Sequence, residues 1–90
     1  MNFTWDQNKA KRNVLKHGVT FEEASTIFGD PLSITIDDPK NSKNEERLII
    51  IGCSSKMNNL IVSHTDDENR VRIISARKST KRERRIYEGI

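Results

Sequence analysis

The residues of this sequence that are best suited to chemistry are basic, and half of them lie in one stretch near the C-terminus. Residues 70–85 contain eight of the sixteen Lys and Arg residues and a single carboxylate, Glu83. Guanidinium groups form paired hydrogen bonds with phosphate oxygens and stay charged at neutral pH. A basic strand that passes into a basic helix therefore indicates a surface for a polyanion, with RNA and DNA as the obvious candidates.

His64 is a residue that can transfer protons near neutral pH. The 2′-hydroxyl of RNA can attack its own phosphodiester if a protein accepts the hydroxyl proton, stabilises the charge on the phosphate and protonates the leaving 5′-oxygen. His64 lies in the middle of a predicted strand, where it could act as general acid or base on the open face of a sheet. The simpler alternative is a half-exposed histidine that pairs with a carboxylate such as Asp66.

Arginines on or near predicted strands are the candidates for binding the reacting phosphate. Arg77 lies where a strand ends and a helix begins, and Arg47 opens the strand with the densest apolar run. For each of them the alternative is an ion pair, which contributes little at a surface. Arg72 and Arg77 are five residues apart and would fall on opposite faces of a regular strand. One would then serve the site while the other meets solvent or a partner.

The basic residues of the last predicted helix indicate a second role, either in guiding RNA or in meeting a protein partner. They lie all around that helix, so one ligand cannot contact them all, and a solvated surface is the alternative. Tyr87 on the same helix could stack on a base or contact a phosphate, or it could anchor the helix. The expected RNA-binding residues are Arg72, Lys81, Arg82, Arg84 and Arg85.

Other kinds of chemistry have no support in the sequence. Two histidines and one cysteine, Cys53, do not make a zinc site, and the four glycines are isolated rather than grouped in a phosphate-binding loop. We therefore expect no metal and no cofactor. One cysteine excludes an intramolecular disulfide and fits a reducing compartment, and no apolar run approaches the roughly 20 residues of a membrane helix. A cytoplasmic location without membrane contact is expected.

The chain begins with signals for two helices. Phe3 and Trp5 alternate with polar residues, which indicates a short extended lead-in. Asp6 as N-cap and Gly18 at the end predict a helix over 7–17. Thr20 and Glu23 form a capping box that begins a second helix, and Gly29 ends it.

After the second helix, apolar residues recur at every second position, which is typical of strands. Strands are predicted over 32–37, 46–54, 60–65 and 70–76, and a second capping box, at Thr80 and Glu83, begins the last helix. The length of 90 residues, 33% of them hydrophobic, predicts one domain over residues 1–90 with a single modest core. The short turns imply an α+β fold with two N-terminal helices, a four-stranded antiparallel sheet and a C-terminal helix.

Several motifs occur in order along nearly the whole chain. The most specific are Lys16-His17-Gly18-Val19 followed by Phe21-Glu22-Glu23-Ala24, and Arg72-Ile73-Ile74-Ser75-Ala76-Arg77-Lys78 followed by Glu83-Arg84 and Tyr87-Glu88. Together they resemble the BrnT toxin family. The resemblance implies a type II toxin–antitoxin system and a RelE-like ribonuclease fold. It also implies a BrnA-like antitoxin with a ribbon-helix-helix domain, in a two-plus-two complex that binds operator DNA through the antitoxin.

Combined with the chemical argument, the resemblance makes five residues the candidate catalytic set: His64, Arg47, Arg77, Lys78 and Tyr87. The predicted function is a metal-independent endoribonuclease that cleaves RNA by attack of the 2′-hydroxyl and inhibits translation. A non-catalytic nucleic-acid-binding module would explain the same charge without requiring catalytic residues. A protein whose basic end docks an acidic partner is also possible, and is compatible with the ribonuclease because an antitoxin could cover the surface that RNA uses.

Overall fold

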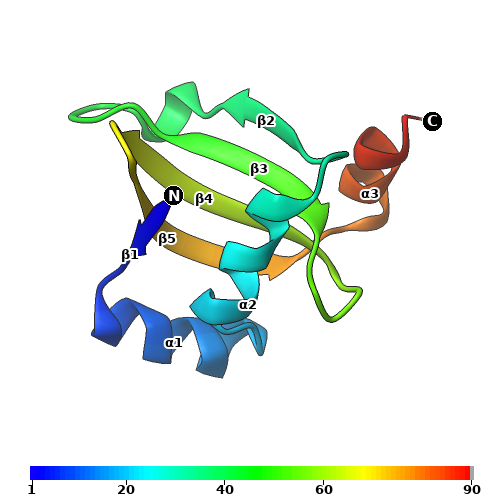
Figure 1. Ribbon diagram of the computed structural model, residues 1–90, viewed down its shortest axis with the longest axis horizontal. Helices are drawn as coiled ribbons and strands as arrows, with labels where there is room; N and C mark the ends of the chain where they lie inside the picture. Colours follow the sequence, from blue (N-terminus) through cyan, green and yellow to red (C-terminus); the bar gives the residue numbers. More distant parts are fainter. Residues whose placement is uncertain (90) are drawn as a thin grey trace.

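The computed structural model describes residues 1–89, and Ile90, the last residue of the predicted domain, lies outside them. Within the described residues the chain forms one sheet with helices against it (Figure 1). The strands are β1 Asn2–Thr4, β2 Ile34–Asp37, β3 Leu48–Cys53, β4 Asn59–Asp67 and β5 Arg70–Lys78. The helices are α1 Gln7–His17, α2 Phe21–Thr26 and α3 Lys81–Glu88, with 3₁₀ turns at Ile27–Gly29 and Pro39–Asn41.

The sheet has five strands in the order β1-β5-β4-β3-β2, and it is mixed rather than purely antiparallel. The prediction of four antiparallel strands is correct for β2 to β5, but it leaves out β1. This strand pairs in parallel with the first residues of β5, with Phe3 opposite Val71. Three residues are too few to show a period, and their partner lies at the other end of the sequence, so the lead-in gave no sign of its pairing.

Helix α1 begins and ends where the sequence predicts. The Asp6 carboxylate accepts hydrogen bonds from the amides of Asn8 and Lys9, at 2.7 and 3.2 Å. Gly18 ends the helix with a φ of 70°, a conformation that costs glycine little. One buried polar side chain holds the helix on the sheet. Asn13 donates to the carbonyls of Val19 and Ala76, at 2.9 and 2.7 Å, and accepts from the amide of Ala76 at 3.0 Å.

Helix α2 follows the prediction at its start but not at its end. The Thr20 hydroxyl accepts from the amide of Glu23 at 3.0 Å, as expected for a cap. The Glu23 carboxylate instead accepts hydrogen bonds from Ser54 at 2.7 Å and Asn58 at 2.8 Å, in the turn between β3 and β4. The α-helix ends at Thr26 and continues as a 3₁₀ turn to Gly29. Glu23 therefore joins the helix to the sheet rather than completing a capping box.

The core lies between the sheet and the helices α1 and α2, which cover one face of it (Figure 1). Its buried members are Val19, Phe21, Ala24, Ile27, Ile50, Leu60, Val62, Val71, Ile73 and Ala76. Aromatic side chains extend it toward the N-terminus, with Trp5 against Phe21 and Phe3 against Phe28 at ring-centroid distances of 5.9 and 5.1 Å. Helix α3 lies apart from this layer and contacts the end of β3.

A β-bulge in β5 changes the face on which its side chains lie. Ser63 pairs with Ser75, but the next residue of β4, His64, pairs with Ile73, so Ile74 is an extra residue on β5. The core residues Ile73 and Ala76 consequently share a face although they are three apart. The expectation that Arg72 and Arg77 lie on opposite faces is therefore wrong. Both point away from the helices, because the bulge shifts the alternation by one.

Candidate functional site

The face of the sheet opposite α1 and α2 carries an open pocket, here called the arginine pocket. It has a volume of about 320 Å³ and extends from the 3₁₀ turn before β3 across β3, β4 and β5. The pairing of the strands brings the lining side chains together. Ser63 of β4 is paired with Ile49 of β3 on one side and with Ser75 of β5 on the other. The pocket is lined by Asp38, Asn41, Arg47, Ile49, Ile61, Ser63, Ile74, Ser75 and Arg77.

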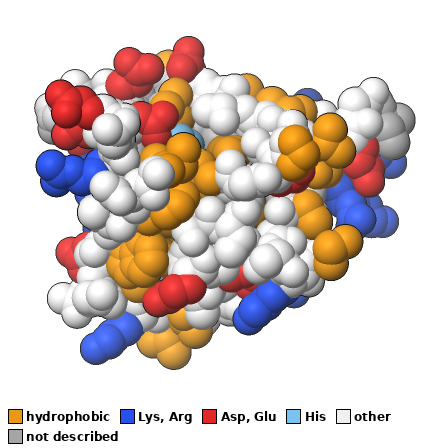
Figure 2. Space-filling view, in the orientation of Figure 1, with side chains coloured by type: hydrophobic (Ala, Val, Ile, Leu, Met, Phe, Trp, Pro, Cys, Tyr) orange, Lys and Arg blue, Asp and Glu red, His pale blue; other side chains and the backbone are white. Residues whose placement is uncertain are grey.

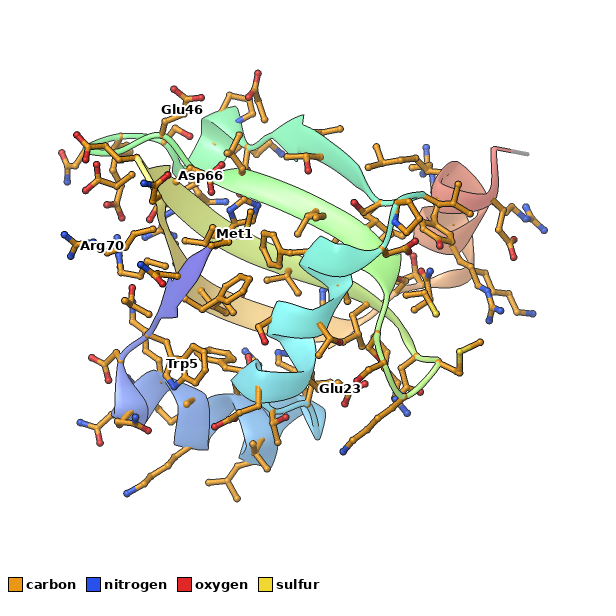
Figure 3. The ribbon with its side chains drawn as sticks, in the orientation of Figure 1. Met1, Trp5, Glu23, Glu46, Asp66 and Arg70 are labelled. Atoms are coloured by element: carbon orange, nitrogen blue, oxygen red, sulfur yellow. The ribbon has the colours of Figure 1, made fainter. Side chains whose placement is uncertain are left out.

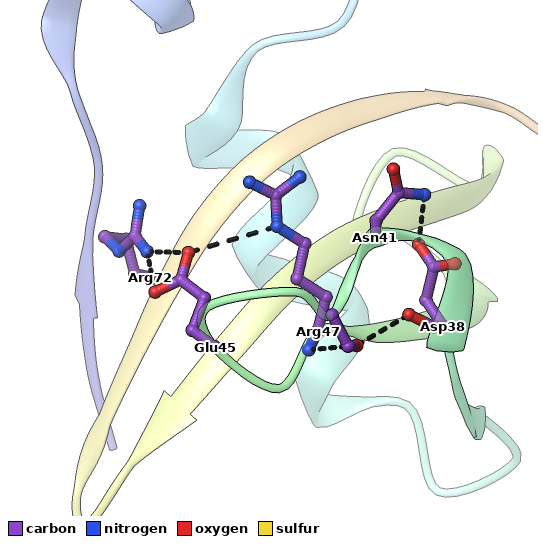
Figure 4. A network of polar contacts seen from close by, with 6 residues as sticks. Asp38, Asn41, Glu45, Arg47 and Arg72 are labelled. Carbon is purple, nitrogen blue, oxygen red and sulfur yellow. Dashed lines mark hydrogen bonds and ion pairs between the residues drawn. The ribbon is translucent and has the colours of Figure 1, made fainter.

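Arg47 contributes a guanidinium group without a close anion. Its Nε atom is buried and has no hydrogen-bond partner in residues 1–89, and the nearest ion pair, to Glu45 Oε1, is 3.9 Å long. The backbone around it is fixed. The amide of Arg47 donates to the hydroxyl of Ser42 at 3.0 Å (Figure 4). The carbonyl of Arg47 accepts from the amide of Asp38, also at 3.0 Å. A guanidinium that has a fixed backbone and only a long ion pair can accept a phosphate.

Arg77 forms the opposite side of the pocket and is already paired. Its two terminal nitrogens donate to the two carboxylate oxygens of Glu83 in α3, each at 2.8 Å. These hydrogen bonds lower the pKa of Glu83 to about 2 and raise the pKa of Arg77. Arg77 is thus positioned by α3, and any phosphate that it binds must share it with Glu83.

Arg72 lies on the same face but beside the arginine pocket, and it too is paired. Its Nη2 donates to both carboxylate oxygens of Glu45 at 2.6 Å. Figure 4 shows Glu45 between Arg72 and Arg47. The predicted role of Arg72 in RNA binding stays a prediction, with Glu45 as the competitor that RNA would have to replace.

His64 is on the other face of the sheet, under the helices. It is 2% exposed, follows the core residues Leu60 and Val62 at intervals of two, and lies edge-on to Phe28 at a ring-centroid distance of 4.9 Å. The expected open-face position is wrong, and so is the half-exposed alternative. The pairing with Asp66 is confirmed, because Nδ1 lies 3.0 Å from Oδ1 of Asp66. Since the sheet separates His64 from the arginine pocket, these groups do not form one constellation.

A second hollow, here called the His64 hollow, opens on the helix side of the sheet. It has a volume of about 530 Å³, and its lining includes His64, Phe28 and Ile50, with Met1, Asp66 and Arg70 around it (Figure 3). Burial lowers the pKa of His64, although Asp66 opposes the shift, so the ring is neutral at pH 7. Its Nε2 has no hydrogen-bond partner among the described residues.

Tyr87 and Lys78 also lie outside the arginine pocket. The Tyr87 hydroxyl donates to Oδ2 of Asp30 at 2.6 Å, and this hydrogen bond raises the pKa of Tyr87 to about 12. The same carboxylate oxygen accepts from the amide of Cys53 at 2.8 Å, so Tyr87 ties α3 to the end of β3. Lys78 pairs in register with the core residue Leu60 and is exposed on the helix side. Their catalytic roles stay predictions that the geometry does not favour.

Figure 2 shows a basic cluster at one end of the helix-covered face and an acidic cluster at the other, with some basic side chains beside the acidic ones. Lys and Arg surround α3, and Asp and Glu gather where β4 turns into β5. In α3, Arg84 pairs with Glu88 at 3.5 Å, whereas Lys81, Arg82 and Arg85 are exposed. None of these four residues lines the arginine pocket. Their predicted role in guiding RNA therefore concerns a surface beyond it.

Sequence reasoning did not find the polar residues that complete the arginine pocket. Asp38 and Asn41 come from the segment between the predicted strands 32–37 and 46–54. This segment forms a 3₁₀ turn, in which Asn41 donates to Asp38 at 2.9 Å. Ser63 belongs to no recognisable motif, and Ser75, although it lies within the motif of residues 72–78, was given no role. The alternation along β4 would have placed Ser63 on the face away from Leu60, and this signal was available.

The described residues contain neither a metal-binding cluster nor a membrane-spanning helix. In residues 1–89 no group of three or more His, Cys, Asp or Glu side chains is placed to hold a metal ion. Within the same range, every helix is too short or too polar to cross a membrane.

Comparison with known proteins places this architecture among characterised families. Residues 5–83 match the family described as the ribonuclease toxin BrnT of type II toxin–antitoxin systems. Among curated proteins, none matches the sequence. The crystal structure of the ribonuclease toxin BrnT from Brucella abortus is similar in fold, with a TM-score of 0.68 and 21% sequence identity over 90% of this chain and 99% of that one.

Proposed function

Because the chain belongs to the BrnT family of ribonuclease toxins of type II toxin–antitoxin systems, we propose that it cleaves RNA at the arginine pocket. The observation that carries this assignment is Arg47, whose guanidinium lines the pocket with a buried Nε and no hydrogen-bond partner in the described chain. The ion pair of this guanidinium with Glu45 is long, at 3.9 Å, so a phosphate in the pocket would supply a closer anion. The site is therefore suited to the anion that a ribonuclease binds.

The proposed reaction is attack of a ribose 2′-hydroxyl on the adjacent phosphorus, without a metal. Arg47 and Arg77 flank the pocket and would bind the non-bridging oxygens, whose charge increases in the transition state. The bond from phosphorus to the 5′-oxygen breaks as the bond to the 2′-oxygen forms. The 5′-oxygen takes a proton from water, and the product carries a 2′,3′-cyclic phosphate. Guanidinium groups supply the charge stabilisation that a metal would otherwise provide, which is the basis for proposing a metal-independent step.

For the proton of the 2′-hydroxyl, we propose Asp38 as acceptor in place of His64. Asp38 lines the pocket, and its carboxylate accepts a hydrogen bond from Asn41. The backbone amide of Asp38 donates to the carbonyl of Arg47, which keeps the two residues close together. A carboxylate can act as general base where geometry brings it to the hydroxyl. His64 is on the far side of the sheet and would reach the substrate only if the sheet opened.

The remaining proposals rest on the family and concern partners and place of action. They are inhibition of translation in the cytoplasm, neutralisation by a BrnA-like ribbon-helix-helix antitoxin, and a two-plus-two complex that binds operator DNA through the antitoxin. Co-expression with the neighbouring reading frame tests them. The expected results are restored growth, co-purification and a particle mass equal to two copies of each chain. A complex of other stoichiometry would contradict the two-plus-two assembly alone.

The test of the reaction is cleavage of RNA in excess chelator by the purified protein and by Arg47→Gln. We expect the variant to lose about a hundredfold or more in rate, because it lacks a donor to the developing charge. Arg85→Gln removes the same charge from the surface of α3 and is the matched control. Circular dichroism establishes that each variant is folded.

Two outcomes would contradict the proposed reaction. One is cleavage that continues when the 2′-hydroxyl at the cleaved position is replaced by hydrogen. The other is cleavage that requires added Mg²⁺. Binding of RNA without cleavage under any condition would favour the alternative of a non-catalytic binding module.

A further inference from the structure

Helix α1 carries a row of unpaired positive charges that the sequence prediction did not assign. Lys9, Arg12 and Lys16 are spaced by three and four residues, so they lie on one side of the helix. The helix contains no Asp or Glu. Within residues 1–89 none of the three forms an ion pair, whereas Arg72 and Arg77 on the sheet are paired with Glu45 and Glu83. The α1 row is therefore available to an external anion.

These cations border a hollow between α1 and β5, here called the α1 hollow. It has a volume of about 350 Å³. Asn13 forms part of it, but its amide is already used in the hydrogen bonds that hold α1 on β5. The full lining is Lys9, Arg12, Asn13, Lys16, His17, Ile74 and Ser75.

The α1 hollow and the arginine pocket meet at the bulge of β5. Ile74 and Ser75 line both of them, so one continuous surface leads from Arg47, over the bulge, to α1. The electrostatics agree with this placement. The pKa of Glu45 is lowered mainly by its hydrogen bond with Arg72, and Lys9 contributes to the shift through space. The charge of Lys9 thus acts on the same carboxylate that pairs with Arg47.

We propose that Lys9, Arg12 and Lys16 of α1 bind the phosphates of the RNA strand that flank the cleaved one, and that this strand enters the arginine pocket across Ile74 and Ser75. The inference rests on the proposed ribonuclease function for the identity of the polyanion. Seven residues of helix rise by about 10 Å, which gives room for about three phosphates, one for each cation. Contacts to phosphates carry no sequence information, so this part of the site contributes affinity and position rather than preference for a base.

The proposed RNA-binding track, formed by Lys9, Arg12 and Lys16, differs from the RNA-binding surface expected on α3. The cations of α3 lie around the helix and outside the arginine pocket, whereas those of α1 share one side and border a hollow that joins that pocket. An acidic segment of a protein partner could also bind a basic helix. RNA is favoured here because the α1 hollow is continuous with the pocket that would hold the cleaved phosphate.

The test compares two triple variants that remove equal charge. One is Lys9→Gln with Arg12→Gln and Lys16→Gln, and the control on α3 is Lys81→Gln with Arg82→Gln and Arg85→Gln. The probe is a fluorescein-labelled RNA twelve-mer with 2′-O-methyl groups throughout, which cannot be cleaved by 2′-hydroxyl attack. Anisotropy gives its dissociation constant between 50 and 200 mM salt, and circular dichroism verifies folding.

The α1 variant is expected to bind about tenfold or more weakly at 100 mM salt. The slope of log affinity against log salt should fall by about 2, because each lost contact to a single strand removes roughly 0.7. The α3 variant should change the slope by less than half as much. A separate variant, Lys9→Arg with Lys16→Arg, keeps the charge and should show the slope of the unmodified chain. Equal slopes for the α1 variant and the unmodified chain, or a larger change in the α3 variant, would overturn the proposal.

A cleavage assay separates this inference from the proposed function. With a long RNA, the α1 variant should show a raised KM and an unchanged kcat, whereas a dinucleotide that fills only the arginine pocket should be cleaved as by the unmodified chain. If the protein cleaves no RNA but the slopes differ as expected, the track stands and the ribonuclease proposal fails. If cleavage depends on Arg47 while the slopes do not differ, the track alone is wrong. A variant that keeps its RNA affinity but loses a co-purifying acidic partner would show α1 to be a protein interface.

Discussion

Burial controls the chemistry of His64 more strongly than its carboxylate neighbour does. A charged imidazole would be stabilised by Asp66 at 3.0 Å, yet the pKa of His64 is lowered because the ring is shielded from water. Glu68 and Arg70, which line the same hollow, add one charge of each sign. His64 therefore contributes to packing as a neutral side chain.

The consequence is a stability that depends on pH. The folded pKa of His64 lies below the unfolded value of 6.5, so the unfolded chain takes up a proton first as the pH falls. Stability is then full well above pH 6.5 and decreases as the pH falls through 6.5. His64→Phe should remove this part of the decrease, as measured by urea unfolding at several pH values. Equal pH dependence in the variant would mean that His64 is not the group responsible.

The elements that could be predicted from the sequence are those with local signals. Helix α1 is bounded by Asp6 and Gly18, and α3 begins with a complete capping box at Thr80. The position of β1 and the bulge at Ile74 depend on partners far away in the sequence, and no local pattern reports them.

The covered face of the sheet could not be predicted for a different reason. Ile51 and Ile61 on the pocket side are 2% and 9% exposed, and Ile50 and Leu60 on the helix side are 3% and 0% exposed. With apolar residues on both faces, alternation separates the faces but does not identify the one beneath the helices. Arg47 and Arg77, predicted to bind phosphate, line one pocket, whereas His64 was assigned to the wrong side.

The contact of α1 with β5 depends on Asn13. Its amide makes three hydrogen bonds and is 6% exposed, so Asn13→Ala leaves the carbonyl and amide of Ala76 without their partner in a buried place. We expect a loss of about 3 kcal/mol in the free energy of unfolding, measured in urea. Asn8→Ala, in the exposed first turn of α1, is the control and should change stability by less than about 0.5 kcal/mol. Similar values for the two variants would contradict the role of Asn13.

The contact of α3 with β5 depends on the ion pair of Glu83 and Arg77. The folded pKa of Glu83, about 2, lies below the usual 4.5, so the carboxylate stabilises the fold above pH 4.5 and this contribution is lost as the pH falls toward 2. After allowance for solvent screening of the partly exposed Arg77, Glu83→Gln should cost about 1 kcal/mol at pH 7.

Urea unfolding from pH 7 to pH 2 measures this difference, which should disappear at the acid end. Glu88→Gln alters the exposed pair with Arg84 and serves as the comparison, with little effect at any pH. A constant difference between Glu83→Gln and the unmodified chain across this range would rule out a charge effect.

In the molecule as a whole, the sheet separates two surfaces with different character. The arginine pocket lies on the face away from the helices and continues across β5 to the α1 hollow. The His64 hollow lies on the helix side, near the acidic residues of the β4–β5 turn (Figure 2). Arg47 and His64 share no hydrogen-bond partner among the described residues. Changes on one surface should therefore leave the other unaffected.

This independence can be tested with one variant on each side. His64→Phe should cleave RNA at the rate of the unmodified chain, while Arg47→Gln should keep the pH dependence of stability and lose cleavage. In the double variant, the two changes in unfolding free energy should add within about 0.5 kcal/mol. A folded His64→Phe protein that binds RNA but does not cleave it would show that His64 acts in the reaction across the sheet.

The extra residue in β5 has a consequence for insertions and deletions. Removal of Ile74 would leave a regular strand in which Ile73 and Ala76 still face the helices and Arg72 and Arg77 still share the other face. The fold does not require this residue, so a chain one residue shorter could satisfy every backbone pair of the sheet. The deletion would remove the apolar side chain that lies between the arginine pocket and the α1 hollow. Gaps at this position among related sequences would then mark differences in how a substrate is held rather than differences in architecture.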